Sequence, residues 1–98
     1  MSSRNAYLKP SQRPAALSLS QALQQSRTMV QAGERDTRRI IAAATGHIES
    51  FDETRIDYIV VVDPETLEDM AVVDRPARMA LAVNVGATRL IDNMALGD

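Results

Sequence analysis

The chain has 98 residues, a formal net charge of −2, and neither cysteine nor tryptophan. This length predicts one domain with a modest core, because so short a chain buries only about 60–70% of its unfolded surface. The missing cysteines exclude disulfides and zinc–thiolate sites, and we expect a cytoplasmic protein. No apolar run approaches the roughly 20 residues that span a bilayer, so we expect no membrane partner. The negative charge and scarce aromatic residues argue against nucleic-acid binding.

The first regular element is predicted to be a long helix. Apolar residues recur at helical spacing from about Gln12 to Ala32. Ser11 is the expected N-cap, and Pro14 fits the first turn, where no backbone N–H is needed. Gly33 should end the helix, because glycine readily adopts the left-handed conformation found just beyond helix C-termini.

A second helix is predicted from about Arg38 to Glu49, capped by Asp36 or Thr37. The short connection makes the two helices antiparallel neighbours. His47 is expected at the flank of this helix, at the edge of the core. Because it is the only histidine, a histidine-based metal site is not expected, and we predict no metal ligands in the chain.

The hydrophobic period changes to that of strands from Ile56 onward. We expect strands over about Ile56–Val62, Ala77–Val85 and Arg89–Leu96, with residues 65–76 largely irregular apart from a short extended piece at 71–73. Gly86 should turn the last two strands with a positive φ. Two antiparallel helices on one face of a small, roughly three-stranded antiparallel sheet make an α+β fold.

Side-chain alternation predicts which face of each strand meets the helices. In the first strand, Ile56, Tyr58, Val60 and Val62 alternate with the residues between them. In the second, one face carries Met79, Leu81, Val83 and Val85 and should meet the helices, whereas Arg78, Ala80, Ala82 and Asn84 should face water or a missing partner. The inward face of the third strand stays open, because Asp92 shares a side with Leu90 and Met94.

The polar stretch at the start of the chain could grip phosphate. Ser2 and Ser3 offer hydroxyl donors, and Arg4 offers a planar, permanently charged guanidinium. In an adenylation reaction such donors would hold the charge that develops on the β- and γ-phosphates of ATP. Taken alone, four polar residues also fit an ordinary frayed terminus.

Blocks distributed along the chain, in this order, turn that motif into a resemblance. They are Met1-Ser2-Ser3-Arg4-Asn5-x-Tyr7-Leu8, Gln31-Ala32-Gly33-Glu34-Arg35-Asp36, Ile56-Asp57-Tyr58, Val62-Asp63-Pro64-Glu65-Thr66-Leu67 and Thr88-Arg89-Leu90-Ile91-Asp92-Asn93. Together they resemble the C-terminal domain of the pantothenate synthetase (pantoate–β-alanine ligase) family, over essentially the whole chain.

The resemblance implies a lid domain, residues 1–98, of an enzyme whose larger Rossmann-like catalytic domain is not in this chain. The family reaction has two steps: pantoate and ATP, with Mg²⁺, give pantoyl adenylate and pyrophosphate, and β-alanine then displaces AMP to give pantothenate. Carried onto this sequence, Met1, Ser2, Ser3 and Arg4 would contact the ATP phosphates. The N-terminal domain of the same enzyme would be the partner, and the full-length protein a homodimer.

The isolated chain is expected to be inactive and to bind ATP weakly at most, because it lacks the pocket that positions pantoate. Asp63 and Glu65 are expected in a solvated turn, and Arg89 with Asp92 and Asn93 in structural roles. The competing interpretation is a non-enzymatic α+β interaction module that binds a protein through the small-residue face of the second strand or the exposed sheet.

Overall fold

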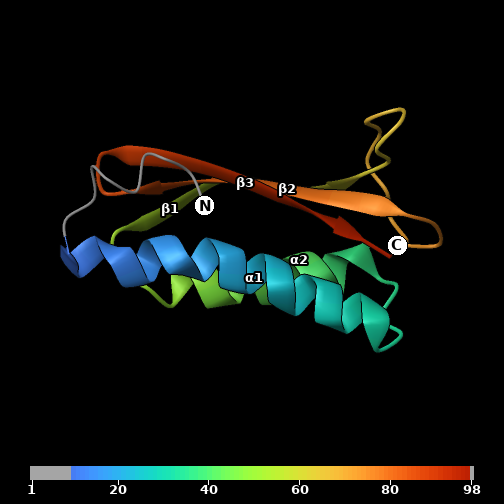
Figure 1. The fold of residues 1–98 in the computed structure, drawn as a ribbon, viewed down its shortest axis with the longest axis horizontal. Helices are drawn as coiled ribbons and strands as arrows, with labels where there is room; N and C mark the ends of the chain where they lie inside the picture. Colours follow the sequence, from blue (N-terminus) through green and yellow to red (C-terminus); the bar gives the residue numbers. More distant parts are fainter. Residues whose placement is uncertain (1–9, 98) are drawn as a thin grey trace.

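The computed structural model describes residues 10–97, which form two helices packed on one face of a three-stranded antiparallel sheet (Figure 1). After a 3₁₀ turn at Pro10–Gln12, the elements are α1 (Arg13–Gln31), α2 (Thr37–Glu49), β1 (Thr54–Val62), β2 (Ala77–Val85) and β3 (Thr88–Leu96). The sheet order is β1-β2-β3. The predicted α+β fold is confirmed, and no end of a helix or strand differs from its prediction by more than two residues.

The ends of α1 follow local chemistry, with one correction. Pro14 lies in the first turn, as predicted, but the N-cap is Gln12, whose side chain makes no capping bond. Ser11 is not the cap because residues 10–12 take a 3₁₀ turn, which delays the α-helix. At the other end Gly33 has φ +107°, and the amides of Gly33 and Glu34 bond the last free carbonyls of the helix.

Asp36 caps α2, and the loop before β2 closes over the same end. The Asp36 carboxylate accepts a hydrogen bond from the Arg38 amide at 3.0 Å. The amide of Thr37 bonds the carbonyl of Ala71, and that of Val73 bonds the carbonyl of Arg35. The short extended piece predicted near residues 71–73 is therefore present as a bridge to the start of α2.

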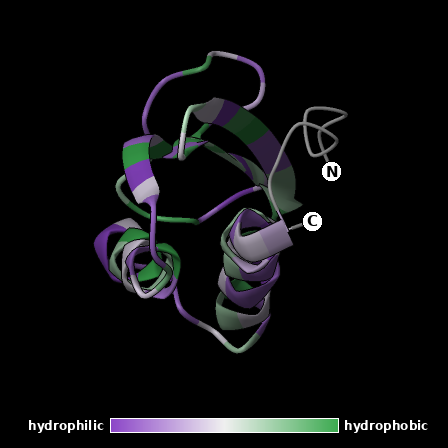
Figure 2. Cartoon of the chain, turned by 90° about the vertical axis from the view of Figure 1, so that its left-hand side faces the viewer, coloured by the Kyte–Doolittle hydropathy of each residue, from purple (hydrophilic) through white to green (hydrophobic). Residues whose placement is uncertain are grey.

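The core lies between the helix pair and the inner face of the sheet. Figure 2 shows the helices side by side beneath the sheet. The side chains with less than 2% exposure that fill this layer include Leu23, Ile40, Ile48, Met79, Leu81, Val83, Val85 and Leu96. The predicted inward face of β2 is therefore confirmed. Burial of these apolar side chains supplies the main driving force for folding.

A β-bulge at Asp57 changes the alternation expected for β1. Ile56 pairs with Val83 and Tyr58 pairs with Ala82, so Asp57 is an extra residue opposite β2. Ile56 consequently shares the inner face with Ile59 and Val61, and only Tyr58 and the alternate residues after it face outward. The expectation that Ile56 and Tyr58 share one face was wrong.

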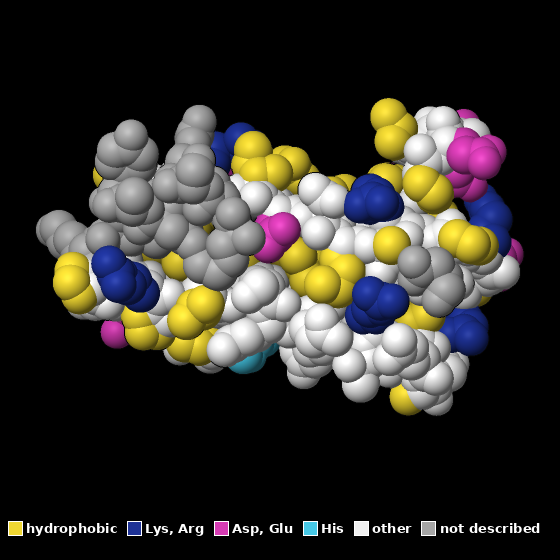
Figure 3. All heavy atoms as spheres, in the orientation of Figure 1, with side chains coloured by type: hydrophobic (Ala, Val, Ile, Leu, Met, Phe, Trp, Pro, Cys, Tyr) yellow, Lys and Arg dark blue, Asp and Glu magenta, His cyan; other side chains and the backbone are white. Residues whose placement is uncertain are grey.

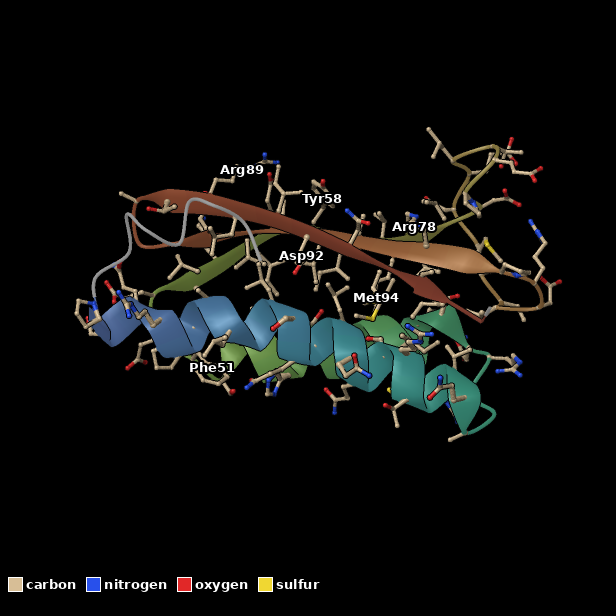
Figure 4. The ribbon with its side chains drawn as sticks, viewed as in Figure 1. Phe51, Tyr58, Arg78, Arg89, Asp92 and Met94 are labelled. Carbon is tan, nitrogen blue, oxygen red and sulfur yellow. The ribbon has the colours of Figure 1, made fainter. Side chains whose placement is uncertain are left out.

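The register of β3 settles its inward face. Leu90, Asp92 and Met94 lie opposite Val83, Leu81 and Met79, which all face the helices. Figure 4 shows Asp92 and Met94 on the helix side of the sheet. Asp92 avoids full desolvation because it is half-buried at the edge strand, and its carboxylate accepts the Asn93 amide at 2.9 Å. This agrees with the expectation of a hydrogen-bonded aspartate near the sheet edge.

Candidate functional site

The predicted ATP-contacting residues Met1, Ser2, Ser3 and Arg4 lie outside the described residues. What the structure gives is the platform from which that N-terminal arm extends, namely the start of α1 and the neighbouring end of the sheet. The site is therefore built here from this platform and from the sheet surface next to it.

An anchor cluster of Gln12, Glu53 and Gly86 joins the start of α1 to the β2–β3 turn. Gln12 is buried, and its side-chain amide donates to the Glu53 carboxylate at 3.3 Å. The Gly86 amide donates to the Glu53 carbonyl at 3.0 Å. Gly86 has φ +60°, as predicted, and a Cβ there would lie 2.3 Å from the Gln12 Nε2 atom. The cluster thus fixes where the chain leaves the preceding arm.

Beside this cluster, the face of the sheet turned away from the helices holds an open polar groove. It has a volume of about 620 Å³ and is lined by Arg55, Ile56, Asp57, Asn84, Gly86 and Arg89. Strand pairing places Arg55, Asn84 and Arg89 in one row across the three strands. Figure 4 shows Arg89 and Tyr58 on this side, opposite to Asp92 and Met94. The groove therefore brings together residues from all three strands.

Two polar pairs cross the same face. The Arg89 guanidinium donates from Nη2 at 2.8 Å and from Nε at 3.2 Å to one oxygen of Asp57, the bulge residue. Nearer the other end of the strands, Arg78 Nη1 donates to Asn93 Oδ1 at 2.6 Å. Arg89 and Asn93 thus have structural partners, as expected, and both tie β3 to another strand across its outward surface.

An apolar centre separates these two pairs. Tyr58, Ala82 and Ile91 stand opposite one another across the strands, and Val60 pairs with Ala80 in the next row. Tyr58 is 37% exposed and Ile91 50% exposed, whereas Ala82 between them is completely buried. The small-residue face of β2 does point away from the helices, as predicted, but its central alanine is already covered by the flanking strands.

The turn after β1 is a hydrogen-bonded structure. The Asp63 carboxylate accepts the amides of Glu65 and Thr66 and a bond from Arg75 Nε at 2.9 Å. The pKa of Asp63 is lowered, first by the Glu65 amide and then by the Arg75 guanidinium, and the pKa of Arg75 is raised by Asp63 in return. These donors stabilise the charged carboxylate. The predicted turn is confirmed, with Asp63 at its centre.

Among residues 10–97, no group of three or more histidine, cysteine or acidic side chains could hold a metal ion. His47 lies on the flank of α2, where its Nε2 bonds Gln21 Oε1 at 2.9 Å and its ring meets the edge of Phe51. Within the same range, no helix is long and apolar enough to cross a membrane.

A family model for "Pantoate-beta-alanine ligase" matches residues 1–95 of the chain. The chain belongs to the pantoate–β-alanine ligase family. The match includes all five blocks that carried the sequence resemblance, so that resemblance is confirmed.

Individual relatives agree with the family match. The chain is 46% identical over 98 residues to "Pantothenate synthetase" of Syntrophus aciditrophicus and 49% identical over 98 residues to that of Acidobacterium capsulatum. The crystal structure of pantothenate synthetase from Thermus thermophilus superposes with a TM-score of 0.85 at 34% identity and covers 96% of the chain. The chain spans only about a third of the length of these proteins: 34%, 33% and 34% respectively.

Sequence reasoning missed the groove and the pair that crosses it. Asp57 breaks the run of apolar residues in β1, and this was the available signal for a bulge. A charged residue inside an otherwise apolar strand is compatible with simple alternation, however, and only the pairing with β2 reveals the extra residue.

Proposed function

We propose that this chain is the part of a pantoate–β-alanine ligase that closes over ATP during adenylation of pantoate. The observation that carries the proposal is the family match over residues 1–95, which includes Met1-Ser2-Ser3-Arg4. In this proposal residues 1–98 are the C-terminal lid domain, and a Rossmann-like domain with the pantoate and ATP pockets makes up the remaining length. The full-length enzyme is proposed to be a cytoplasmic homodimer.

The proposed chemistry has two balanced steps. The carboxylate of pantoate attacks the α-phosphate of ATP, and pyrophosphate leaves. The amine of β-alanine then attacks the acyl carbon of the adenylate, and AMP leaves with formation of the amide. Arg4 would hold negative charge on the β- and γ-phosphates as the first bond breaks, and Ser2 and Ser3 would add donors. Mg²⁺ would enter with ATP, held chiefly by its phosphates.

The anchor cluster supports a lid role for the arm. Gln12, Glu53 and Gly86 fix the beginning of α1 to the sheet, so residues 1–9 extend from a firmly held point. A guanidinium on such an arm can close on the nucleotide after it binds, and closure excludes water from the adenylate. Water exclusion matters because a mixed anhydride hydrolyses when water reaches it.

Activity of a full-length polypeptide tests the proposal. In this polypeptide the chain replaces the matching third of the S. aciditrophicus enzyme, to which it is 46% identical. We expect AMP release that requires both pantoate and β-alanine. Arg4→Ala should lower kcat by roughly 100-fold or more, the cost typical of losing one charge-stabilising donor.

Arg39→Ala is the matched control for that substitution. Arg39 is exposed on α2, and its amide bond to the Asp36 carbonyl does not use the side chain. We expect it to leave kcat within about two-fold of the unsubstituted enzyme, as for an ordinary surface position. Equal rates for Arg4→Ala and the unsubstituted enzyme would show that Arg4 does not act on ATP.

A further inference from the structure

We propose that the outer face of the sheet packs against the remaining part of the ligase polypeptide. The outer face is defined as the side of β1, β2 and β3 turned away from the helices; it carries Arg55, Asp57, Tyr58, Val60, Arg78, Ala80, Ala82, Asn84, Arg89, Ile91 and Asn93. The inference rests on the proposed function in treating the chain as part of a longer ligase. It does not depend on what Arg4 does.

The centre of this face has the character of a contact surface. Tyr58 and Ile91 are large, stand on either side of the buried Ala82, and remain 37% and 50% exposed. Val60 and Ala80 continue the apolar area along the strands. Protein interfaces commonly have such an apolar centre with a polar rim, and tyrosine is enriched among their energetically important residues. Figure 3 shows hydrophobic side chains gathered along the upper, sheet side of the molecule.

Charge gives the chemistry of the matching surface. The rim holds three arginines, Arg55, Arg78 and Arg89, against the single carboxylate of Asp57, so the face is positive although the chain carries −2 overall. Complementary potentials favour docking and fix its orientation. The surface that meets this face should therefore be apolar at its centre and acidic at its margin.

The size of the face favours a connected partner over a second free copy. Three strands about 4.8 Å apart and roughly 30 Å long present about 430 Å². A stable complex of separate proteins buries about 800 Å² on each side. A partner on the same polypeptide needs less contact, because the linkage supplies a high effective concentration. The relatives are about three times as long as this chain, so such a connected partner exists in them.

Thiol labelling tests the proposal directly, because the chain contains no cysteine. Ile91→Cys places a thiol on the outer face, and Ala42→Cys places one on the exposed side of α2 as the control. Each variant is made in the 98-residue chain and in the full-length polypeptide that carries it within the S. aciditrophicus enzyme. Labelling rates at each position are measured by mass spectrometry, and Tyr58→Cys provides a second probe of the face.

We expect labelling at positions 91 and 58 to be slower by roughly ten-fold or more in the full-length protein, as for a surface at the centre of an interface, with position 42 little changed. Equal rates at position 91 in the two contexts, or protection at position 42 instead, would overturn the proposal. So would protection at position 91 in the isolated chain that grows with concentration, because the occupant would then be a second copy.

Two further arms keep the result interpretable. If the hybrid protein does not fold, the same labelling is done in the intact S. aciditrophicus enzyme at the positions aligned with Ile91 and Ala42, and the same outcomes decide. The Arg4→Ala variant separates this inference from the lid proposal. An active Arg4→Ala enzyme with a protected position 91 would reject only the ATP contact, whereas a loss of activity with an unprotected position 91 would reject only the docking face.

Discussion

Two glycines in this chain have opposite roles, and their substitution by alanine should have opposite effects. Gly86→Ala puts a side chain at φ +60° and against Gln12, so we expect a loss of about 1–2 kcal/mol in unfolding free energy. Gly46→Ala is the counterpart within α2, where a Cβ meets nothing within 4 Å and should add up to about 1 kcal/mol. Thermal unfolding should show Tm shifts in opposite directions, and shifts of the same sign would contradict the account. At this scale the sequence predicted the positive φ of Gly86 but not the contact with Gln12, which depends on tertiary structure. The Asp63 turn makes stability depend on acidity. The folded-state pKa of Asp63 is lowered by the Glu65 amide first and by Arg75 second, so its contribution is present above the unfolded pKa, about 4, and is lost as pH falls through the lower folded value. Asp63→Asn should therefore lower Tm at pH 7 and have a smaller effect near pH 2. Glu65→Gln is the control for removing a charge from the same turn, since only the Glu65 amide bonds Asp63. An equal loss from Asp63→Asn at both pH values would show that its charge is not what stabilises the turn.

At the level of elements, the cap of α2 should matter more than the ion pair beside it. Asp36→Ala removes the bond to the Arg38 amide and should cost about 1 kcal/mol. Arg38→Ala removes an Arg38–Asp36 contact of 3.7 Å from a side chain that is 92% exposed, and it should cost almost nothing. Urea unfolding of the two variants checks this order, and a larger loss for Arg38→Ala would contradict it. The helices were predictable because their apolar spacing and end residues, such as Gly33 and Asp36, act locally. The bulge at Asp57 was not, because pairing with β2 defines it. The face of Asp92 was ambiguous for a similar reason, since only its register against Leu81 shows that an aspartate can lie inward at a half-buried edge.

At the scale of the whole molecule, helices cover one face of the sheet and leave the other with an apolar centre and a positive rim. The isolated chain should release no AMP from ATP, pantoate and β-alanine, because it cannot orient pantoate against the α-phosphate. A coupled AMP assay that detected turnover by the 98-residue chain would contradict this. The interaction-module interpretation and the lid interpretation share the outer face, and they differ in whether residues 1–4 act on ATP. Exchange of labelled pyrophosphate into ATP, dependent on pantoate and without β-alanine, measures adenylation alone in the full-length polypeptide. The account predicts that Arg4→Ala lowers this exchange by roughly 100-fold or more, whereas reaction of supplied pantoyl adenylate with β-alanine stays unchanged. Undiminished exchange in Arg4→Ala, or a loss confined to the β-alanine step, would contradict it.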